Sequence, residues 1–388
     1  MSSAEKLHKI FYSLIKRPVD IFCRIKFNSR AERPADFEGP FLVISNHVTL
    51  YDMFFVAQNF RPHMYFVASE HSMRAGLGSR LLKFFFDPII RPKATVGAAT
   101  VIKMKKRLKA GHNVCLFAEG ERNACGASRK IPRATASVVK MLGVKLVTFR
   151  IHGGFLSSPR WSRTARRGRI WCDVANIYSP EALKAMSDDE LDARINADIF
   201  VDAYAENAER RIAYRGKALA EGIELELVKC PKCGSLNSIK SRGDEFFCDC
   251  GLRGTYDEYG EISGEGFDFR TVTEWDEWEK REIENMPIPE PKTPICRDPG
   301  QQLIEIGGGH TETLIDSGEL LLTPESISVG NTFIALLDLS RYDLIGRGQL
   351  LITTKDGKYY QIGGKDRAFS GFLYILLLDR LLSDRDEQ

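Results

Sequence analysis

The chain has 388 residues, and its 55 Lys and Arg nearly balance its 52 Asp and Glu. The resulting charge of +3 excludes binding of nucleic acid or anionic lipid through bulk charge, so such binding needs a local patch. The length predicts two or three domains, and no apolar run reaches the roughly 18 to 20 residues of a membrane-spanning helix.

The first predicted element is a helical region within residues 4–27. Apolar residues recur there at helical spacing among Lys and Arg, and Pro18 predicts a break into two short helices. One interpretation is a helix that covers a domain core. The other is an amphipathic helix lying in a membrane interface, because cations flank an apolar face rich in Phe and Ile.

Residues 40–175 predict an α/β fold. Apolar runs of strand length alternate with helical patterns, which favours a largely parallel sheet covered by helices. The predicted strands are 41–45, 64–68, 114–118, 145–151 and 169–175, and the predicted helices between them include 51–58, 101–109 and 133–142.

The end of the first predicted strand carries the candidate catalytic residues. His47 follows Ser45 in a loop, and Asp52 lies five residues later, in the first turn of the next helix. The carboxylate can fold back to the imidazole, orient it and stabilise the imidazolium that forms when the ring takes a proton. A helix start with a capping Asp would explain the same pair without catalysis.

Two further segments bring polar residues to the same edge of the sheet. Phe117-Ala-Glu-Gly-Glu-Arg-Asn123 follows a predicted strand, and Pro88-Ile-Ile-Arg91 lies between it and His47. Together with Asn46-His47-x4-Asp52, these segments resemble the sequence blocks of the glycerol-phosphate and lysophospholipid acyltransferase superfamily. The resemblance covers roughly residues 30–215.

The resemblance implies an O-acyltransferase of the 1-acylglycerol-3-phosphate acyltransferase type, without a catalytic cofactor. His47, oriented by Asp52, would be the general base for a hydroxyl of a lysophospholipid or glycerophosphate-like acceptor. That hydroxyl would attack an acyl thioester of CoA or of acyl carrier protein. The implied substrate-binding residues are Asn46, Arg91, Glu119, Gly120 and Arg122.

Several roles follow for these residues. The two arginines could hold a phosphate through forked hydrogen bonds. Glu119 could bind an acceptor hydroxyl or brace its turn through Arg122. Backbone N–H groups near Gly120, or at the helix start after His47, could stabilise the oxyanion.

The chain departs from the family blocks at Ala118, Glu121 and Asn123, where Pro, Thr and Ser are usual, and its fourth block lacks a proline. Two other functions therefore stay open. One is a non-catalytic lipid-binding or regulatory protein on the same fold, and the other is a nucleic-acid-associated adaptor. The intact His-Asp pair and Glu119 favour the enzyme.

A basic stretch at residues 159–169 contains five Arg and Trp161. A solvated loop between two strands explains this composition. Alternatively, the stretch contacts anionic headgroups or a nucleotide-bearing thioester carrier, since Trp and cations suit a lipid surface. The near-neutral charge of the whole chain argues against nucleic acid as the partner.

Four cysteines form a predicted metal site. Cys230-Pro-Lys-Cys233-Gly is a zinc-knuckle turn, and Cys248-Asp-Cys250-Gly follows after 14 residues. Four thiolates favour tetrahedral Zn²⁺, in a structural and not a catalytic site because protein fills every position. A redox pair or inert cysteines are the alternative.

The cysteine total also bears on the compartment. Nine cysteines, an odd number, argue against a disulfide framework and for a reducing compartment. The N-terminus lacks the apolar stretch of a secretory leader. Together with the amphipathic helix, these features predict a cytoplasmic protein that is peripheral on the inner face of the membrane.

The remaining sequence predicts a linker and a last domain. Pro and charge accumulate at 282–299, short β patterns follow as far as residue 362, and an amphipathic helix is predicted at 367–382. By strand pattern and final helix only, this region resembles a pleckstrin-homology-like domain. The predicted division is an N-terminal helix region at 1–28, an acyltransferase domain at 29–222, a zinc ribbon at 223–260, a linker at 261–300 and a small β-rich domain at 301–388.

Overall fold

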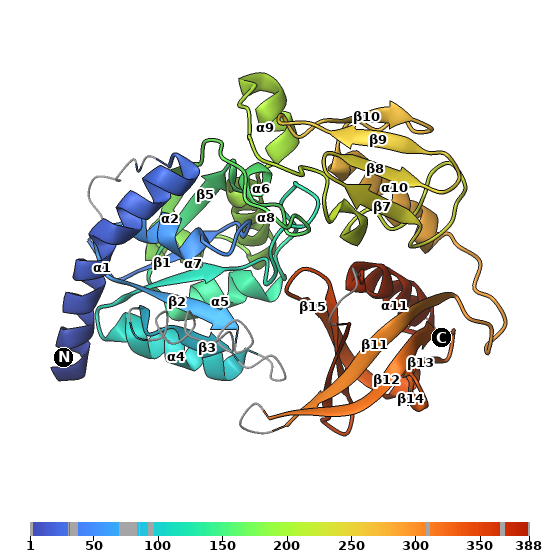
Figure 1. Ribbon diagram of the computed structural model, residues 1–388. Coiled ribbons are helices and arrows are strands. Elements are labelled where there is room, and N and C mark those ends of the chain that lie inside the picture. The colour runs from blue at the N-terminus through green and yellow to red at the C-terminus, as the bar shows by residue number, and fades with distance from the viewer. Residues whose placement is uncertain are drawn as a thin grey trace. The chain divides into compact units, whose positions relative to one another are not determined.

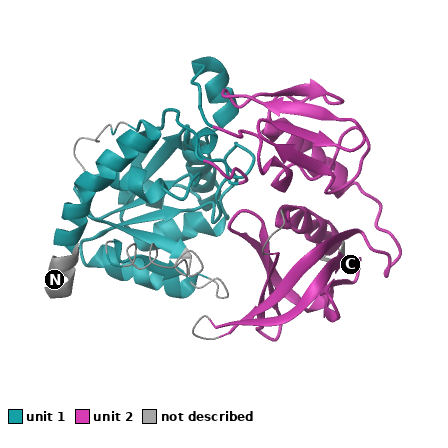
Figure 2. Cartoon of the chain, viewed as in Figure 1, with its two compact units in different colours: residues 1–160, 165–216 teal, residues 161–164, 217–388 magenta. Residues whose placement is uncertain are grey.

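The structure is a computed structural model of the chain (Figure 1), and it describes residues 3–29, 31, 38–69, 84, 86–91, 97–307, 311–364 and 369–386. The chain divides into two compact units, which Figure 2 shows in different colours: residues 1–160 with 165–216, and residues 161–164 with 217–388. Among the described helices, none is both long enough and apolar enough to cross a membrane.

A six-stranded sheet in the order β3-β2-β4-β1-β5-β6 lies at the centre of the first unit. Its neighbouring strands pair in parallel, except that β6 runs antiparallel to β5. The predicted α/β class with a largely parallel sheet is therefore confirmed. The strands are β1 (Phe41–Ser45), β2 (Met64–Ser69), β3 (Ile89–Arg91), β4 (Asn113–Phe117), β5 (Lys145–His152) and β6 (Trp171–Tyr178).

Helices cover both faces of this sheet (Figure 1), and the side chains of β1 alternate between the two resulting cores. Phe41 and Val43 pack in a core with α1 and α2, whereas Leu42 and Ile44 pack in a core with α4, α5 and α8. The helices are α1 (Ser3–Phe27), α2 (Asp52–Asn59), α4 (Ala98–Lys109), α5 (Ala134–Leu142), α6 (Gly154–Ser157), α7 (Pro180–Ala185), α8 (Asp188–Ile199) and α9 (Ala203–Arg210).

Helix α1 is continuous, with Pro18 inside it, so the predicted break at this proline is wrong. Tyr12, Val19 and Cys23, which lie on both sides of the proline, are buried in the same core. A proline inside a helix costs about 3 kcal/mol because it cannot donate a backbone hydrogen bond. Burial of one apolar face on both sides of Pro18 outweighs this cost.

The second unit contains two antiparallel sheets. The smaller sheet, in the order β10-β9-β8-β7, follows the short 3-10 helix η2 (Ile223–Leu225) and precedes helix α10 (Val272–Glu284). Its strands are β7 (Ile239–Arg242), β8 (Glu245–Cys248), β9 (Arg253–Tyr256) and β10 (Ile262–Glu265).

The larger sheet has the order β14-β13-β12-β11-β17-β16-β15 and packs against the final helix α11 (Gly371–Asp386). Leu373 and Leu377 of α11 share one core with Leu320 and Ile352 of the sheet. Of the helix predicted at 367–382, residues 367 and 368 lie outside the described residues. The strands are β11 (Cys296–Ile306), β12 (Glu312–Leu322), β13 (Ser326–Val329), β14 (Thr332–Ala335), β15 (Leu339–Ile345), β16 (Gln349–Thr354) and β17 (Tyr359–Gly363), and a 3-10 helix, η4 (Leu336–Asp338), precedes β15.

The structure corrects the predicted linker at 261–300, because β10 and α10 occupy much of it. Because α10 is rich in charged residues, the sequence pattern did not reveal the face of the helix that is buried. Trp275 and Ile283 of this helix are buried, and so is Glu279. One carboxyl oxygen of Glu279, Oε2, accepts hydrogen bonds from the backbone N–H groups of Val228 and Lys229, so this acidic residue helps to pack the helix.

Candidate active site

The candidate site begins where β1 ends, at the centre of the six-stranded sheet. His47 lies in the loop between β1 and α2, and Asp52 is the first residue of α2. The contact expected from their spacing is present, with 2.7 Å between His47 Nδ1 and Asp52 Oδ2. This position is the carboxyl end of a parallel strand, where open α/β sheets place their sites.

Asp52 is held by more than the histidine. Its side chain is 1% exposed and accepts hydrogen bonds from the backbone N–H groups of Val48 (2.7 Å) and Thr49 (3.0 Å). The Thr49 hydroxyl donates a further bond at 2.7 Å. Because all these partners are donors, the carboxylate is fixed as an acceptor. The role of Thr49 was not predicted, although a Thr three residues before an Asp at a helix start is a signal for such a turn.

The Asp52 carboxylate determines the tautomer of His47. Only an N–H can face this acceptor, so the proton lies on Nδ1 and the lone pair on Nε2. The side chain is 26% exposed, so solutes can reach it. The ring of Phe117 stacks on the imidazole, with 4.7 Å between centroids and 21° between planes, and so limits rotation of the ring.

Asn46 is completely buried and bonded to β5 on both sides of its amide. Its Nδ2 donates to the carbonyl of Ile151 at 2.9 Å, and its Oδ1 accepts from the N–H of Ile151 at 2.8 Å. This geometry corrects the prediction that Asn46 binds substrate. The side chain instead joins the loop before His47 to the neighbouring strand.

Glu119 holds the backbone on both sides of the candidate site. Its Oε1 accepts from the His47 N–H at 2.8 Å, and its Oε2 accepts from the Arg129 N–H at 3.1 Å. It therefore braces its turn through these two backbone groups. Burial raises the pKa of Glu119 to about 7, although the two N–H donors act in the opposite direction.

Replacing Glu119 with Gln should change how stability depends on pH. The folded state raises the pKa from 4.5 to about 7, so it binds more protons than the unfolded state within this window, and stability falls as pH rises through it. Gln does not titrate in this range. The loss of one carboxylate oxygen as an acceptor changes the unfolding free energy by an amount that does not depend on pH. The unfolding free energy of the variant relative to wild type should therefore rise by about 1 to 3 kcal/mol between pH 4.5 and 8. Urea unfolding at several pH values measures this difference, and a constant difference would contradict the expectation.

The predicted phosphate-binding arginines belong to segments that meet the same turn. Arg91 ends β3, and its Nη1 lies 3.9 Å from the position that a Cβ on Gly120 would occupy. Gly120 has φ +78°, in the left-handed region that favours glycine. Arg122 directly precedes Asn123, whose N–H donates to the His47 carbonyl at 2.7 Å. The structure thus places Arg91 beside Gly120. It also joins Asn123, the neighbour of Arg122 in the chain, to the backbone of His47.

Three of the candidate oxyanion donors, the N–H groups of Gly120, Val48 and Thr49, have partners within the protein. The Gly120 N–H donates to the Phe117 carbonyl at 3.3 Å. The N–H groups of Val48 and Thr49, at the helix start, donate to Asp52. These hydrogen bonds shape the turn and fix the carboxylate.

A second histidine lies nearby but lacks the features of a base. His152, at the end of β5, is 5% exposed, and both of its ring nitrogens contact carboxylates. Nδ1 lies 2.7 Å from Glu206 and Nε2 lies 2.5 Å from Asp173. Burial lowers the pKa of His152, but the two acidic partners outweigh it and raise the pKa overall. With both nitrogens occupied, His152 joins β5, β6 and α9.

The basic stretch at 159–169 is not simply a solvated loop. Trp161 is completely buried, and Arg160 and Arg166 are 6% and 2% exposed, although Arg163 and Arg167 are exposed. The structure therefore corrects both interpretations at Trp161, which neither lies in solvent nor can reach a lipid surface.

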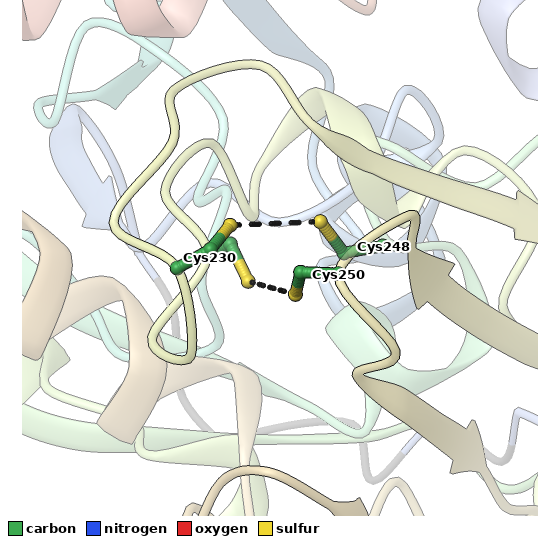
Figure 3. A group of neighbouring side chains, drawn as sticks. Cys230, Cys248 and Cys250 are labelled. Carbon is green, nitrogen blue, oxygen red and sulfur yellow. Dashed lines mark hydrogen bonds between the residues drawn. The ribbon is translucent and has the colours of Figure 1, made fainter.

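The four predicted metal ligands converge from two turns of the second unit. Figure 3 shows Cys230, Cys248 and Cys250, and the Sγ atoms of all four cysteines lie within 4.8 Å of one another. The Sγ atoms of Cys230 and Cys250 are 3.6 Å apart, and those of Cys233 and Cys248 are 3.8 Å apart. A tetrahedron with Zn–S bonds of about 2.3 Å has edges of about 3.8 Å, so the donor set fits Zn²⁺.

Comparison with known proteins assigns the region that contains His47, Asp52 and Glu119. Residues 23–152 match the family Acyltransferase, so the resemblance predicted from the sequence is confirmed for these residues. No curated protein matches the chain. Among solved structures, the 1-acyl-sn-glycerophosphate (LPA) acyltransferase PlsC of Thermotoga maritima is similar, with 17% identity and a TM-score of 0.42 over 51% of this chain and 80% of that one.

Proposed function

We propose that the protein transfers a fatty acyl group from a thioester, of CoA or of acyl carrier protein, to a hydroxyl of a lysophospholipid or glycerophosphate-like acceptor. The acyltransferase domain at residues 23–152 supports this assignment. The observation that carries it is the contact of 2.7 Å between His47 Nδ1 and Asp52, which leaves Nε2 as the basic nitrogen of a side chain that is 26% exposed.

In the proposed reaction, His47 Nε2 takes the proton of the acceptor hydroxyl while the oxygen attacks the thioester carbon. Asp52 keeps the ring in the required tautomer and stabilises the imidazolium. The tetrahedral intermediate then collapses, the C–S bond breaks, and the imidazolium returns its proton to the thiolate. Phe117 and Asp52 together hold the ring, so little reorganisation is needed during the reaction.

The acceptor's phosphate would bind near Arg91 and Arg122. The proximity of Arg91 to Gly120, and of Asn123 to the His47 carbonyl, supports this placement. Guanidinium groups suit phosphate because they donate two parallel hydrogen bonds. A phosphate anchored there would leave the acceptor's glycerol hydroxyls to reach toward His47.

The cysteine cluster would hold one structural Zn²⁺. Cys230, Cys233, Cys248 and Cys250 supply four thiolates, and an ion bound by four protein ligands has no open position for substrate. When bound, the ion cross-links the knuckle turn to the end of β8. It would take no part in acyl transfer.

We also propose that helix α1 binds a membrane interface. The protein would then be cytoplasmic and peripheral on the inner face of the membrane. Its buried face packs on the sheet, but Ile10, Leu14, Ile21 and Ile25 are 56%, 64%, 56% and 68% exposed. These residues recur at helical spacing, so they form one stripe. Arg17 and Arg24 are also exposed on this helix, which suits anionic lipid.

Replacing Leu14 with Glu should therefore weaken binding to vesicles that contain anionic phospholipid by about 10- to 100-fold, since burying one Leu contributes about 1.5 to 3 kcal/mol. Leu337, which is equally exposed at 64%, is the matched control in the second unit. Leu337→Glu should leave vesicle binding unchanged. Equal effects of the two substitutions, measured by sedimentation with vesicles, would contradict the role of α1.

The test of the proposed function is thiol release from acyl-CoA or acyl carrier protein across a panel of lysophospholipids and glycerol phosphates. Release that depends on both an acceptor and His47 supports the proposal. If no acceptor gives release that is lost in His47→Ala, the protein is not an acyltransferase of this type.

A further inference from the structure

The turn after β4 is connected to a buried arginine from the basic stretch. Arg160 Nη1 donates to Glu121 Oε2 at 3.2 Å, and the same oxygen lies 3.8 Å from Arg129 Nη1. Arg160 is 6% exposed and Glu121 is 22% exposed, so the pair is only partly screened by water. Glu121 stands where the acyltransferase blocks usually carry Thr, so this pair is a feature of this chain.

From Arg129 the contacts continue to the candidate base. The Arg129 N–H donates to Glu119, and the other oxygen of Glu119 accepts from the His47 N–H. An unbroken series of polar contacts therefore runs from Arg160 through Glu121, Arg129 and Glu119 to the backbone of His47.

The residue after Arg160 belongs to the second unit. Trp161 is completely buried, and its ring lies 5.4 Å from that of Tyr256 at an angle of 78°. Tyr256 ends β9, the strand that follows the Cys250 turn. Gly222 has φ +95°, and a Cβ there would lie 2.3 Å from the Trp161 carbonyl oxygen, so only glycine fits. Thr164, which closes the segment, donates to the Lys217 carbonyl at 3.0 Å.

We propose that Arg160 is a positioning residue for the acyl-transfer site and that the buried Trp161, adjacent to it in the chain, restricts its backbone. The proposal rests on the proposed function of His47. A buried indole restricts the backbone of its neighbour, so the guanidinium is presented to Glu121 with little freedom. The guanidinium in turn orders the turn that carries Glu119 and Arg122, which would otherwise lose entropy when the acceptor binds.

The order of the turn can be measured without acyl transfer, through hydrogen exchange of the Asn123 amide in the full chain. This N–H donates to the His47 carbonyl at 2.7 Å, so it reports whether the turn is closed on the site. Arg160→Ala and Trp161→Ala should each speed its exchange by about tenfold or more, whereas Trp161→Phe, which keeps a ring against Tyr256, should stay near wild type. Unchanged exchange in Arg160→Ala would overturn the proposal. Because this variant leaves Trp161 in place, it tests the contact with Glu121 even if Trp161→Ala does not fold.

Kinetics give a second readout. Arg160→Ala should raise the acceptor KM by about tenfold with little change in the thioester KM, and Arg160→Lys should recover part of the loss. Glu121→Thr combined with Arg160→Ala should be no worse than Arg160→Ala alone, because the two residues act through one contact. Losses that multiply in the double variant would show independent roles and overturn the proposal. Absence of acyl transfer would remove this readout but would leave the exchange result decisive.

Discussion

Replacing His47 with Ala is expected to lower the kcat of acyl transfer by about 100- to 10,000-fold, the range that a positioned general base contributes. The substitution removes Nε2, the one ring nitrogen of His47 that Asp52 does not hold. Thiol release from the acyl thioester, followed at saturating acceptor, measures the change. The KM values should move far less, because the imidazole acts on the proton and not on the bulk of either substrate.

Asp52→Asn should also lower kcat, because the carboxamide of Asn no longer favours the tautomer of His47 that the reaction requires. The double substitution of His47 and Asp52 should be little worse than His47→Ala, since the pair works as a unit. His63→Ala, a histidine outside this pair, is the control and should keep kcat within a few-fold of wild type. A His47→Ala protein that retains wild-type kcat would exclude histidine base catalysis at this site.

Removal of the ribbon metal should have the largest effect on stability. Structural Zn²⁺ in small cysteine-rich folds contributes about 10 to 16 kcal/mol of apparent binding free energy at neutral pH. The smaller sheet of the second unit has short strands, and the cysteines lie in the turn that precedes it, at the end of β8 and in the turn between β8 and β9. Metal analysis should therefore find one equivalent per chain, and a strong chelator should lower the melting temperature of the second unit.

The cysteine variants separate a metal site from general cysteine chemistry. Cys230→Ser and Cys233→Ser should each lose the metal and increase hydrogen exchange in β7 to β9. Cys296→Ser changes a buried cysteine of the same unit outside the cluster, and it should retain one equivalent. A metal-free wild-type protein that stays folded would reject the zinc ribbon.

The sequence predicted those parts of the fold that depend on local periodicity. The alternation of Phe41 and Val43 with Leu42 and Ile44 is visible in the chain, and it places β1 between two cores. The spacing of His47 and Asp52 was equally readable, because a loop followed directly by a helix start leaves few paths for a carboxylate. Short edge strands such as β3 carry too few residues for a pattern of their own.

Contacts between distant segments were beyond sequence reasoning. The polar side chain of Asn46, next to His47, suggests a binding residue. Its hydrogen-bond partner is instead Ile151, more than a hundred positions away. Trp161 lies among arginines that suggest a surface, yet it packs against Tyr256 and Gly222, which lie far along the chain. The same limit applies to Pro18, where long-range packing overrides a local rule.

Trp161–Thr164 belong to the second unit although the chain on both sides of them belongs to the first. The polypeptide therefore enters the second unit, returns to the first and enters the second again. A chain that ended at Gly216 would keep Trp161 but lose Tyr256 and Gly222, the residues against which Trp161 packs. A single cut of the chain therefore cannot yield both units intact.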